Sequence, residues 1–265
     1  MRTSDFMVTH PVFSLDEATA ALAPPGGRRG AAQRLKHHLA SGRLALVTRG
    51  IYAVVPPGAT AGDLDPDPLL VAAAARPDAI FAHHSAFDLL GVAHSAWRIT
   101  TVFTARRRGR LALRGGTVAF FEDPQALRAS GLRHLGTRRV EHRGRLLVVT
   151  GPERTLVESL RRPTLAGGQE EFLQSAGAFP TLDLALLADI LERYDTARLW
   201  AAVGWFLERH QSGFSVPESF LDRLEARRPA TALYLQRDQR GGTLEPRWNL
   251  VVPDSAFRLS AGDER

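Results

Sequence analysis

Apolar positions early in the chain repeat every three to four residues, as they do on one face of a helix. Ser14 and Glu17 have the spacing of a capping box, so we expect a helix to begin there and to end at the prolines and glycines of residues 24–27. A second helix is expected over residues 28–41, with Gly42 as its stop. Each helix is predicted to bury one face.

The period then changes to that of strands. Residues 43–47 and 51–55 are β-rich runs on either side of Thr48-Arg49-Gly50, a three-residue connection that suits a hairpin. Helix, turn, helix and hairpin in this order predict a winged helix-turn-helix domain over residues 1–56. Residues 57–66 are rich in helix and strand breakers and are expected to form a linker to a larger domain, residues 67–265.

The larger domain mixes both periods, which predicts the α+β class: a winged helix-turn-helix followed by a mixed α/β domain with a mainly helical C-terminal portion. Helix starts are expected at three capping patterns, namely Ser85, Thr150 with Glu153, and Ser215 with Glu218. Strands are expected at residues 79–82, 99–104, 117–121, 145–149, 233–236 and 248–251, and further helices at 67–75, 182–194 and 197–209.

Composition narrows the classes of function. The 265 residues are 44% hydrophobic and include no cysteine, which excludes disulfides, thiolate metal sites and cysteine nucleophiles. Lys36 is the only lysine, so a phosphate-binding Walker loop, a Schiff-base site and a lysine-dependent nuclease are all disfavoured. No apolar run is long enough for a membrane span and no leader pattern is present, so we expect a cytoplasmic protein without enzymatic activity.

Charge points to a polyanionic partner. The chain holds 34 basic and 28 acidic residues, a net charge of +6. Residues 1–56 hold seven basic and three acidic residues, so about a fifth of the length carries +4 of that excess. This concentration is typical of a nucleic-acid-binding module joined to a more neutral body.

The predicted second helix places its polar residues on the side opposite Leu35. Arginine pairs with guanine and glutamine with adenine in the major groove, so Arg29 and Gln33 are the expected base readers, with Arg49 at the tip of the wing. A solvated helix face or a protein-contact surface are the alternatives. The full set expected at DNA is Arg28, Arg29, Gln33, Arg34, Lys36, His37, Arg43, Thr48 and Arg49.

Three other clusters carry candidate chemistry. Arg106, Arg107, Arg108 and Arg110 form a basic run that is expected either to contact phosphate or an acidic partner, or to be a solvated hairpin tip. Metal ligation is disfavoured for the histidines at 83, 84 and 94, because neighbours on a strand face opposite ways, and a capping role is expected for His84 and Ser85. The aspartates at 63, 65 and 67 lack a calcium-loop pattern and are expected to be linker charge.

Three segments together resemble the AbiEi-like antitoxins, the transcription-regulating partners in type IV toxin-antitoxin and abortive-infection systems. The first is the sequence of the predicted winged helix, which includes Arg49-Gly50-Ile51-Tyr52. The others are the runs His84-Ser85-Ala86 and Pro152-Glu153-Arg154-Thr155. The resemblance implies an operator-binding autorepressor on inverted repeats of duplex DNA. It also implies that the C-terminal domain, without a cofactor, antagonises a co-encoded nucleotidyltransferase-like toxin. The alternative is a regulator whose C-terminal domain senses a ligand or docks a protein.

Overall fold

The structure is a computed structural model that describes residues 2–106, 108–236 and 239–258. Its helices and mixed sheets make it an α+β protein, as the sequence predicts. The chain forms two compact units: residues 1–79, 98–121 and 141–147 make up the first, and residues 80–97, 122–140 and 148–265 the second. The residues predicted as a linker, 57–66, therefore lie inside the first unit.

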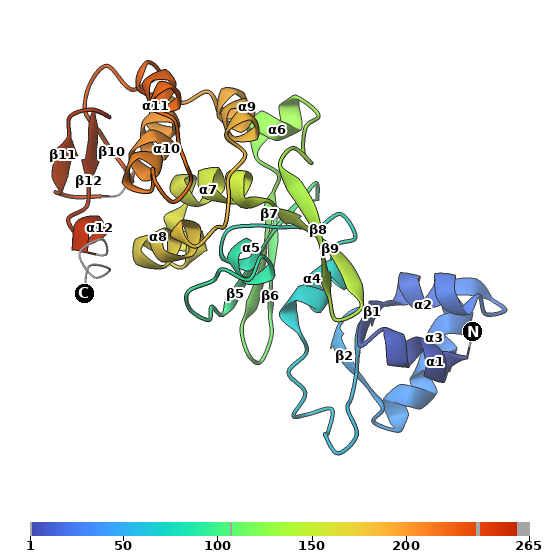
Figure 1. The fold of residues 1–265 in the computed structure, drawn as a ribbon. Coiled ribbons are helices and arrows are strands. Elements are labelled where there is room, and N and C mark those ends of the chain that lie inside the picture. Colours follow the sequence, from blue (N-terminus) through green and yellow to red (C-terminus); the bar gives the residue numbers. More distant parts are fainter. Residues whose placement is uncertain (1, 107, 237–238, 259–265) are drawn as a thin grey trace. The chain divides into compact units, whose positions relative to one another are not determined.

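The first unit opens with helices and strands that alternate closely along the chain (blue in Figure 1). They are α1 (Thr3–Thr9), β1 (Val12–Ser14), α2 (Leu15–Leu22), α3 (Gly27–Ala40), β2 (Leu44–Thr48) and β3 (Ile51–Val54). The predicted capping box is present, because Ser14 Oγ accepts from the Glu17 N–H and the Glu17 carboxylate accepts from the Ser14 N–H. The three strands form an antiparallel sheet in the order β1-β3-β2, in which β1, like α1, was not predicted.

A shared core holds these elements together. Phe13 on β1, Leu22 on α2 and Leu35 on α3 are buried in one cluster with Leu44 and Tyr52 from the two hairpin strands. The two helices are thus fixed to the sheet through apolar side chains, which leaves their opposite faces to solvent.

The rest of the first unit consists of α4 (Pro68–Ala75), β5 (Ile99–Thr104), β6 (Gly109–Ala112) and β7 (Thr117–Glu122). Helix α4 is buried from Leu69 through Ala74 and packs against Val12 and Ile51 of the N-terminal sheet. Strands β6 and β7 pair as an antiparallel hairpin.

The second unit is mainly helical in its C-terminal part. Its elements are β4 (Ile80–Phe81), α5 (His84–Leu89), α6 (Gln125–Ala129), α7 (Pro152–Arg161), the short 3-10 helix η1 (Pro163–Ala166), α8 (Gln169–Gly177), α9 (Leu184–Tyr194), α10 (Ala197–Arg209), α11 (Glu218–Glu225), β10 (Leu233–Tyr234), β11 (Thr243–Glu245), β12 (Leu250–Val252) and α12 (Ser255–Arg258). The last three strands form a sheet in the order β10-β12-β11, and β4 runs parallel to β9 (Arg145–Thr150).

Three of the four tryptophans, Trp200, Trp205 and Trp248, are buried in this unit. A Cβ atom on Gly204 of α10 would lie only 2.1 Å from the Trp248 ring, so this helix position must be glycine for the ring to pack. Trp97, by contrast, is 42% exposed.

A hairpin of β8 (Thr137–His142) and β9 (Arg145–Thr150) runs through both units along the chain. Its tip, residues 141–147, belongs to the first unit, whereas residues 137–140 and 148–150 belong to the second. The sequence predicted β9 but not β8.

Three predicted helix caps are wrong. Helix α5 begins at His84, after His83 in a left-handed conformation, and the Ser85 side chain does not cap it. Helix α7 begins after Gly151, and α11 begins after Pro217 with no side-chain cap. At α7 the reason is tertiary: the Thr150 hydroxyl bonds Thr155, and the Glu153 carboxylate accepts from the Asp183 N–H at 2.8 Å.

Helix α7 carries an unusually polar buried face. The Arg154 guanidinium is fully buried, and its Nη1 donates to the carbonyls of Arg133 (2.6 Å) and Leu135 (3.0 Å). The equally buried Glu158 lies 4.0 Å from Arg154 and accepts from the Tyr194 hydroxyl. Burial raises the pKa of Tyr194, so this phenol remains a hydrogen-bond donor. The polar residues of α7 therefore hold neighbouring backbone and side chains in place.

Replacing Arg154 by Met is expected to lower the free energy of unfolding by about 3–5 kcal/mol, because Glu158 loses a buried cation and two carbonyls lose their donor. Urea unfolding followed by tryptophan fluorescence measures this loss. Arg193→Ala is the control: this exposed arginine pairs with Asp189 on α9, and its loss is expected to cost less than about 1 kcal/mol. Similar losses for the two variants would contradict the role of Arg154.

Candidate nucleic-acid interface

Helix α3 presents one continuous polar face to solvent. Ala31 and Leu35 are buried beneath it, whereas the residues expected at DNA on this helix are all exposed: Arg28, Arg29, Gln33, Arg34, Lys36 and His37. The turn before the helix is tight, because a Cβ atom on Gly30 would lie 2.1 Å from the Pro25 carbonyl oxygen. Gly30 thus allows the turn to lie against the first turn of α3 and fixes where its exposed face begins.

The cations on this face differ in their availability. Arg28 forms an ion pair with Asp16 of α2, so part of its charge is already neutralised. Among the described residues, the structure records no ion-pair partner for Arg29, Arg34 or Lys36. Free guanidinium and ammonium groups on an exposed helix are suited to donate hydrogen bonds to phosphate oxygens or to a base edge. Beside them, burial lowers the pKa of His38, which keeps that imidazole neutral at physiological pH.

The hairpin of β2 and β3 follows directly on α3. Leu44 of β2 packs in the same core cluster as Leu35, so hairpin and helix belong to one rigid arrangement. Gly50 has a φ of +82°, and the strand register shifts between Leu46 and Thr48. Arg49 is exposed in the turn, Arg43 is exposed before β2, and Thr48 is half-buried.

A second group of arginines belongs to the same unit. Residues 98–121 contain six arginines and no acidic residue. Arg106, Arg108 and Arg110 are exposed before and within β6, and Arg107 lies outside the described residues. Across the whole first unit there are 16 basic and 8 acidic residues, a net charge of +8, whereas the second unit has 18 and 20, a net charge of −2. All of the protein's positive excess therefore lies in the first unit.

The residues predicted as linker charge have defined partners, which corrects that expectation. Asp67 caps α4 by accepting from the N–H groups of Leu69 and Leu70. Asp65 accepts from the Gly115 N–H at 3.0 Å, and Arg114 donates to the Gly62 carbonyl at 2.9 Å. The segment before α4 is thus tied to the turn between β6 and β7.

The histidine cluster is organised by Glu171 of α8. This carboxylate accepts from the backbone N–H groups of His94 and Ser95 and from the hydroxyls of Ser95 and Ser175, and it lies 3.2 Å from His84 Nε2. The predicted capping role of His84 and Ser85 is therefore wrong, because His84 faces a carboxylate on another helix. His83 is also buried, and burial lowers its pKa to about 3, so it is neutral. This network anchors the loop before Trp97.

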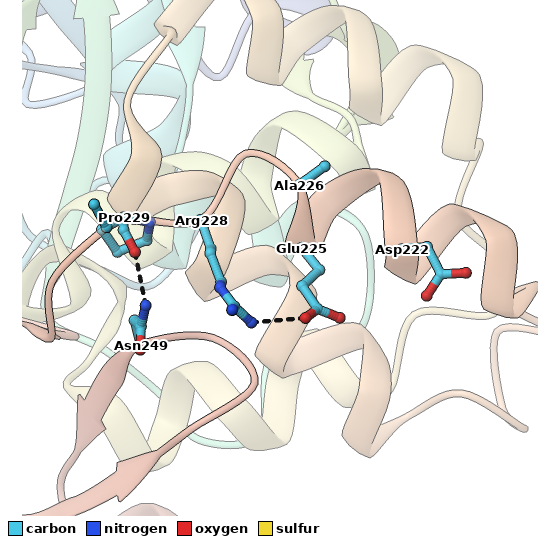
Figure 2. Close-up of a pocket in the computed structure, with 7 residues that line it drawn as sticks. Asp222, Glu225, Ala226, Arg228, Pro229 and Asn249 are labelled. Atoms are coloured by element: carbon cyan, nitrogen blue, oxygen red, sulfur yellow. Dashed lines mark hydrogen bonds and ion pairs between the residues drawn. The ribbon is translucent and has the colours of Figure 1, made fainter.

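The second unit also has a surface pocket. A pocket beside α11 is lined by Asp222, Glu225, Arg228, Pro229 and Asn249 (Figure 2). Its polar groups already pair with one another: Arg228 binds Glu225, and the Asn249 amide donates to the Pro229 carbonyl at 2.9 Å. Across residues 2–106, 108–236 and 239–258, no three His, Asp or Glu side chains gather as metal ligands would. In that same part of the chain, no helix is long and apolar enough to cross a membrane.

Acidification is expected to remove stability through Glu171. Burial alone would raise the pKa of this carboxyl, but hydrogen bonds from Ser95 and Ser175 hold it below its ordinary value of 4.5. The stabilisation is therefore complete above that value and is lost as pH falls through the lowered pKa of the folded state.

Urea midpoints measured from about pH 6 to pH 3 test this expectation. Glu171→Gln is expected to show a shallower loss of stability on acidification than the wild-type protein. Glu170→Gln, which changes the exposed neighbour on α8, is expected to keep the wild-type slope. An unchanged slope in the Glu171 variant would contradict this role.

No family model matches the sequence, and no curated protein matches it. Among solved structures, the chain is similar to the crystal structure of the RV2827C protein from Mycobacterium tuberculosis, with a TM-score of 0.62 and 18% sequence identity. The match covers 97% of this chain and 92% of that one, so the two proteins share a fold over nearly their whole lengths.

Proposed function

We propose that this protein is a sequence-specific DNA-binding repressor whose first unit reads DNA through a winged helix-turn-helix. The observation that carries the proposal is the exposed face of α3, on which Arg29, Gln33 and Lys36 project from a helix fixed to its hairpin by a common core. In such modules the second helix enters the major groove and the hairpin contacts the flanking backbone. The net charge of +8 on the first unit supports attraction to duplex DNA.

Different residues of the first unit would contact the bases and the phosphates of DNA. Arg29 and Gln33 lie one helical turn apart and would contact base edges, whereas Arg34, Lys36 and Arg43 would contact phosphates. Arg49 would bind at or near a minor groove. Arg106, Arg108 and Arg110, in the same unit, would add contacts to the backbone, which carry affinity but no sequence information.

We further propose that the repressor acts as the antitoxin of a toxin-antitoxin pair in the cytoplasm, opposing a nucleotidyltransferase-like toxin, with no catalytic residue of its own. This part rests on the resemblance of three segments to the AbiEi-like antitoxins. Two of those segments contribute buried polar groups, His84 at Glu171 and Arg154 at two backbone carbonyls. Both groups are buried and bind within the second unit, so they do not form an exposed surface for a toxin.

The second candidate function is a regulator whose second unit docks a protein. One observation favours it. Tyr234 on β10 and Leu244 on β11 both pair with Val251 of the central strand and are 45% and 48% exposed, so they form a partly exposed apolar row across this sheet. Exposed apolar groups that adjoin one another are typical of protein contact sites.

Arg29→Ala and Gln33→Ala are expected to relax base preference by about 1–3 kcal/mol each, because each removes a direct contact to a base edge. The measurement is affinity for the DNA immediately upstream of the protein's own reading frame, compared with a random-sequence duplex at the same salt concentration. Arg49→Ala is expected to weaken binding to both duplexes alike.

Arg223→Ala serves as the charge-matched control, since it removes an exposed arginine of α11 in the second unit. It is expected to leave both affinities unchanged. If Arg29→Ala weakened binding to both duplexes equally, Arg29 would be a phosphate contact and not a base reader.

Antitoxin activity is tested by co-expression with a nucleotidyltransferase-like toxin encoded next to this protein, both from unrelated promoters. Wild-type protein is expected to restore growth. The double variant Tyr234→Ser and Leu244→Ser separates the two candidate functions. It is expected to keep repression of an operator reporter. Loss of growth rescue in this variant would assign toxin antagonism to the apolar row. Failure of the wild-type protein to restore growth would contradict direct antagonism and leave transcriptional repression as the function.

A further inference from the structure

The Glu17 carboxylate has two separate partners. One oxygen accepts from the Ser14 N–H at 2.7 Å and completes the capping box of α2. The other accepts from Arg145 Nη2 at 2.5 Å. Arg145 lies 128 residues further along the chain, at the start of β9. A distant arginine is thus bound to the group that defines where the first helix of the helix-turn-helix begins.

Arg145 is itself held by the elements around it. The same Nη2 lies 3.3 Å from the Ala73 carbonyl, near the C-terminal end of α4. His142 Nε2 lies 2.8 Å from Asp67, the residue that caps the other end of α4, and Arg143 approaches the same carboxylate at 3.3 Å. The tip of the β8–β9 hairpin is therefore bound to both ends of α4 as well as to α2.

The ion pair of Arg145 and Glu17 is partly buried, with side chains 24% and 31% exposed. This partial burial makes it stronger than a surface pair. Ala18 and Leu22 of α2 are buried in the same cluster as Leu35 of α3, so a rotation or displacement of α2 moves the exposed face of α3. Base readout requires that face to be placed within a fraction of an ångström to about one ångström of its productive position.

We infer that Arg145 is a positioning residue for the DNA reader: through Glu17 it fixes the start of α2, and through α2 the orientation of α3, without touching DNA itself. The inference rests on the proposed function. Arg145 lies at the tip of the β8–β9 hairpin, within residues 141–147 of the first unit.

The test compares the ratio of affinities for the upstream duplex and a random duplex. Arg145→Ala is expected to lower this ratio about fivefold, the effect of losing a partly buried pair worth about 1 kcal/mol. Arg145→Lys, which keeps the charge, is expected to restore most of it. Glu17→Gln keeps a residue that can serve in a capping box and is expected to match Arg145→Ala, with no further loss when both changes are combined.

Arg139→Ala is the matched control, because it removes an exposed arginine from β8 of the same hairpin. It is expected to leave the ratio unchanged. An unaltered ratio in Arg145→Ala, an equal fall in Arg139→Ala, or multiplying losses in the double variant would each overturn the positioning role.

A second measurement distinguishes failure of this inference from failure of the proposed function. Wild-type protein that binds both duplexes equally contradicts sequence-specific repression itself. In that case amide exchange in the free protein decides whether the contact holds α2. Arg145→Ala is expected to speed exchange at Glu17 and Ala18 relative to the wild-type protein and to Arg139→Ala, and an unchanged rate would overturn the inference.

Discussion

The arrangement of the N-terminal helices depends on one carboxylate, that of Glu17. It closes the capping box at Ser14 and binds Arg145, so the same side chain defines where α2 begins and joins it to a hairpin distant in sequence. Helix α2 in turn packs with α3 and the β2–β3 hairpin in one small apolar cluster. A module of this size buries too little apolar surface to be strongly stable alone. Polar contacts such as those of Glu17 therefore help to fix the position of the exposed face of α3.

Charged and polar residues are exposed in the first unit and buried in the second at the positions that stand out in each. The first unit carries the entire positive excess, and the arginines on α3 are exposed, as are Arg106 and Arg108 before β6. In the second unit the most notable polar residues are buried and bind the protein itself, as Arg154 does at two carbonyls and Glu171 does at the loop before Trp97. Polar side chains of the second unit thus stabilise its interior, whereas the exposed positive charge lies in the first unit.

Local patterns predicted what depends on neighbours in sequence. The capping box at Ser14, strand 99–104 and helix 197–209 lie where expected, because spacing and turn residues determine them. The caps expected at Thr150 and Ser215 failed, and at Thr150 the reason is visible, since its hydroxyl binds Thr155. The exposed face of α3 followed from helical geometry. The contact of Arg145 with Glu17 joins residues 128 apart, and nothing in either local sequence distinguishes that arginine from its neighbours.

We propose that the first unit binds DNA through α3 and the β2–β3 hairpin, so bound DNA should cover both elements. Hydrogen-deuterium exchange of the full chain, with and without the duplex from upstream of its own reading frame, measures this. Exchange is expected to slow in peptides covering residues 27–40 and 44–54 and to stay unchanged in those covering α11, residues 218–225. Protection confined to the second unit, or no protection at saturating DNA, would contradict that proposal.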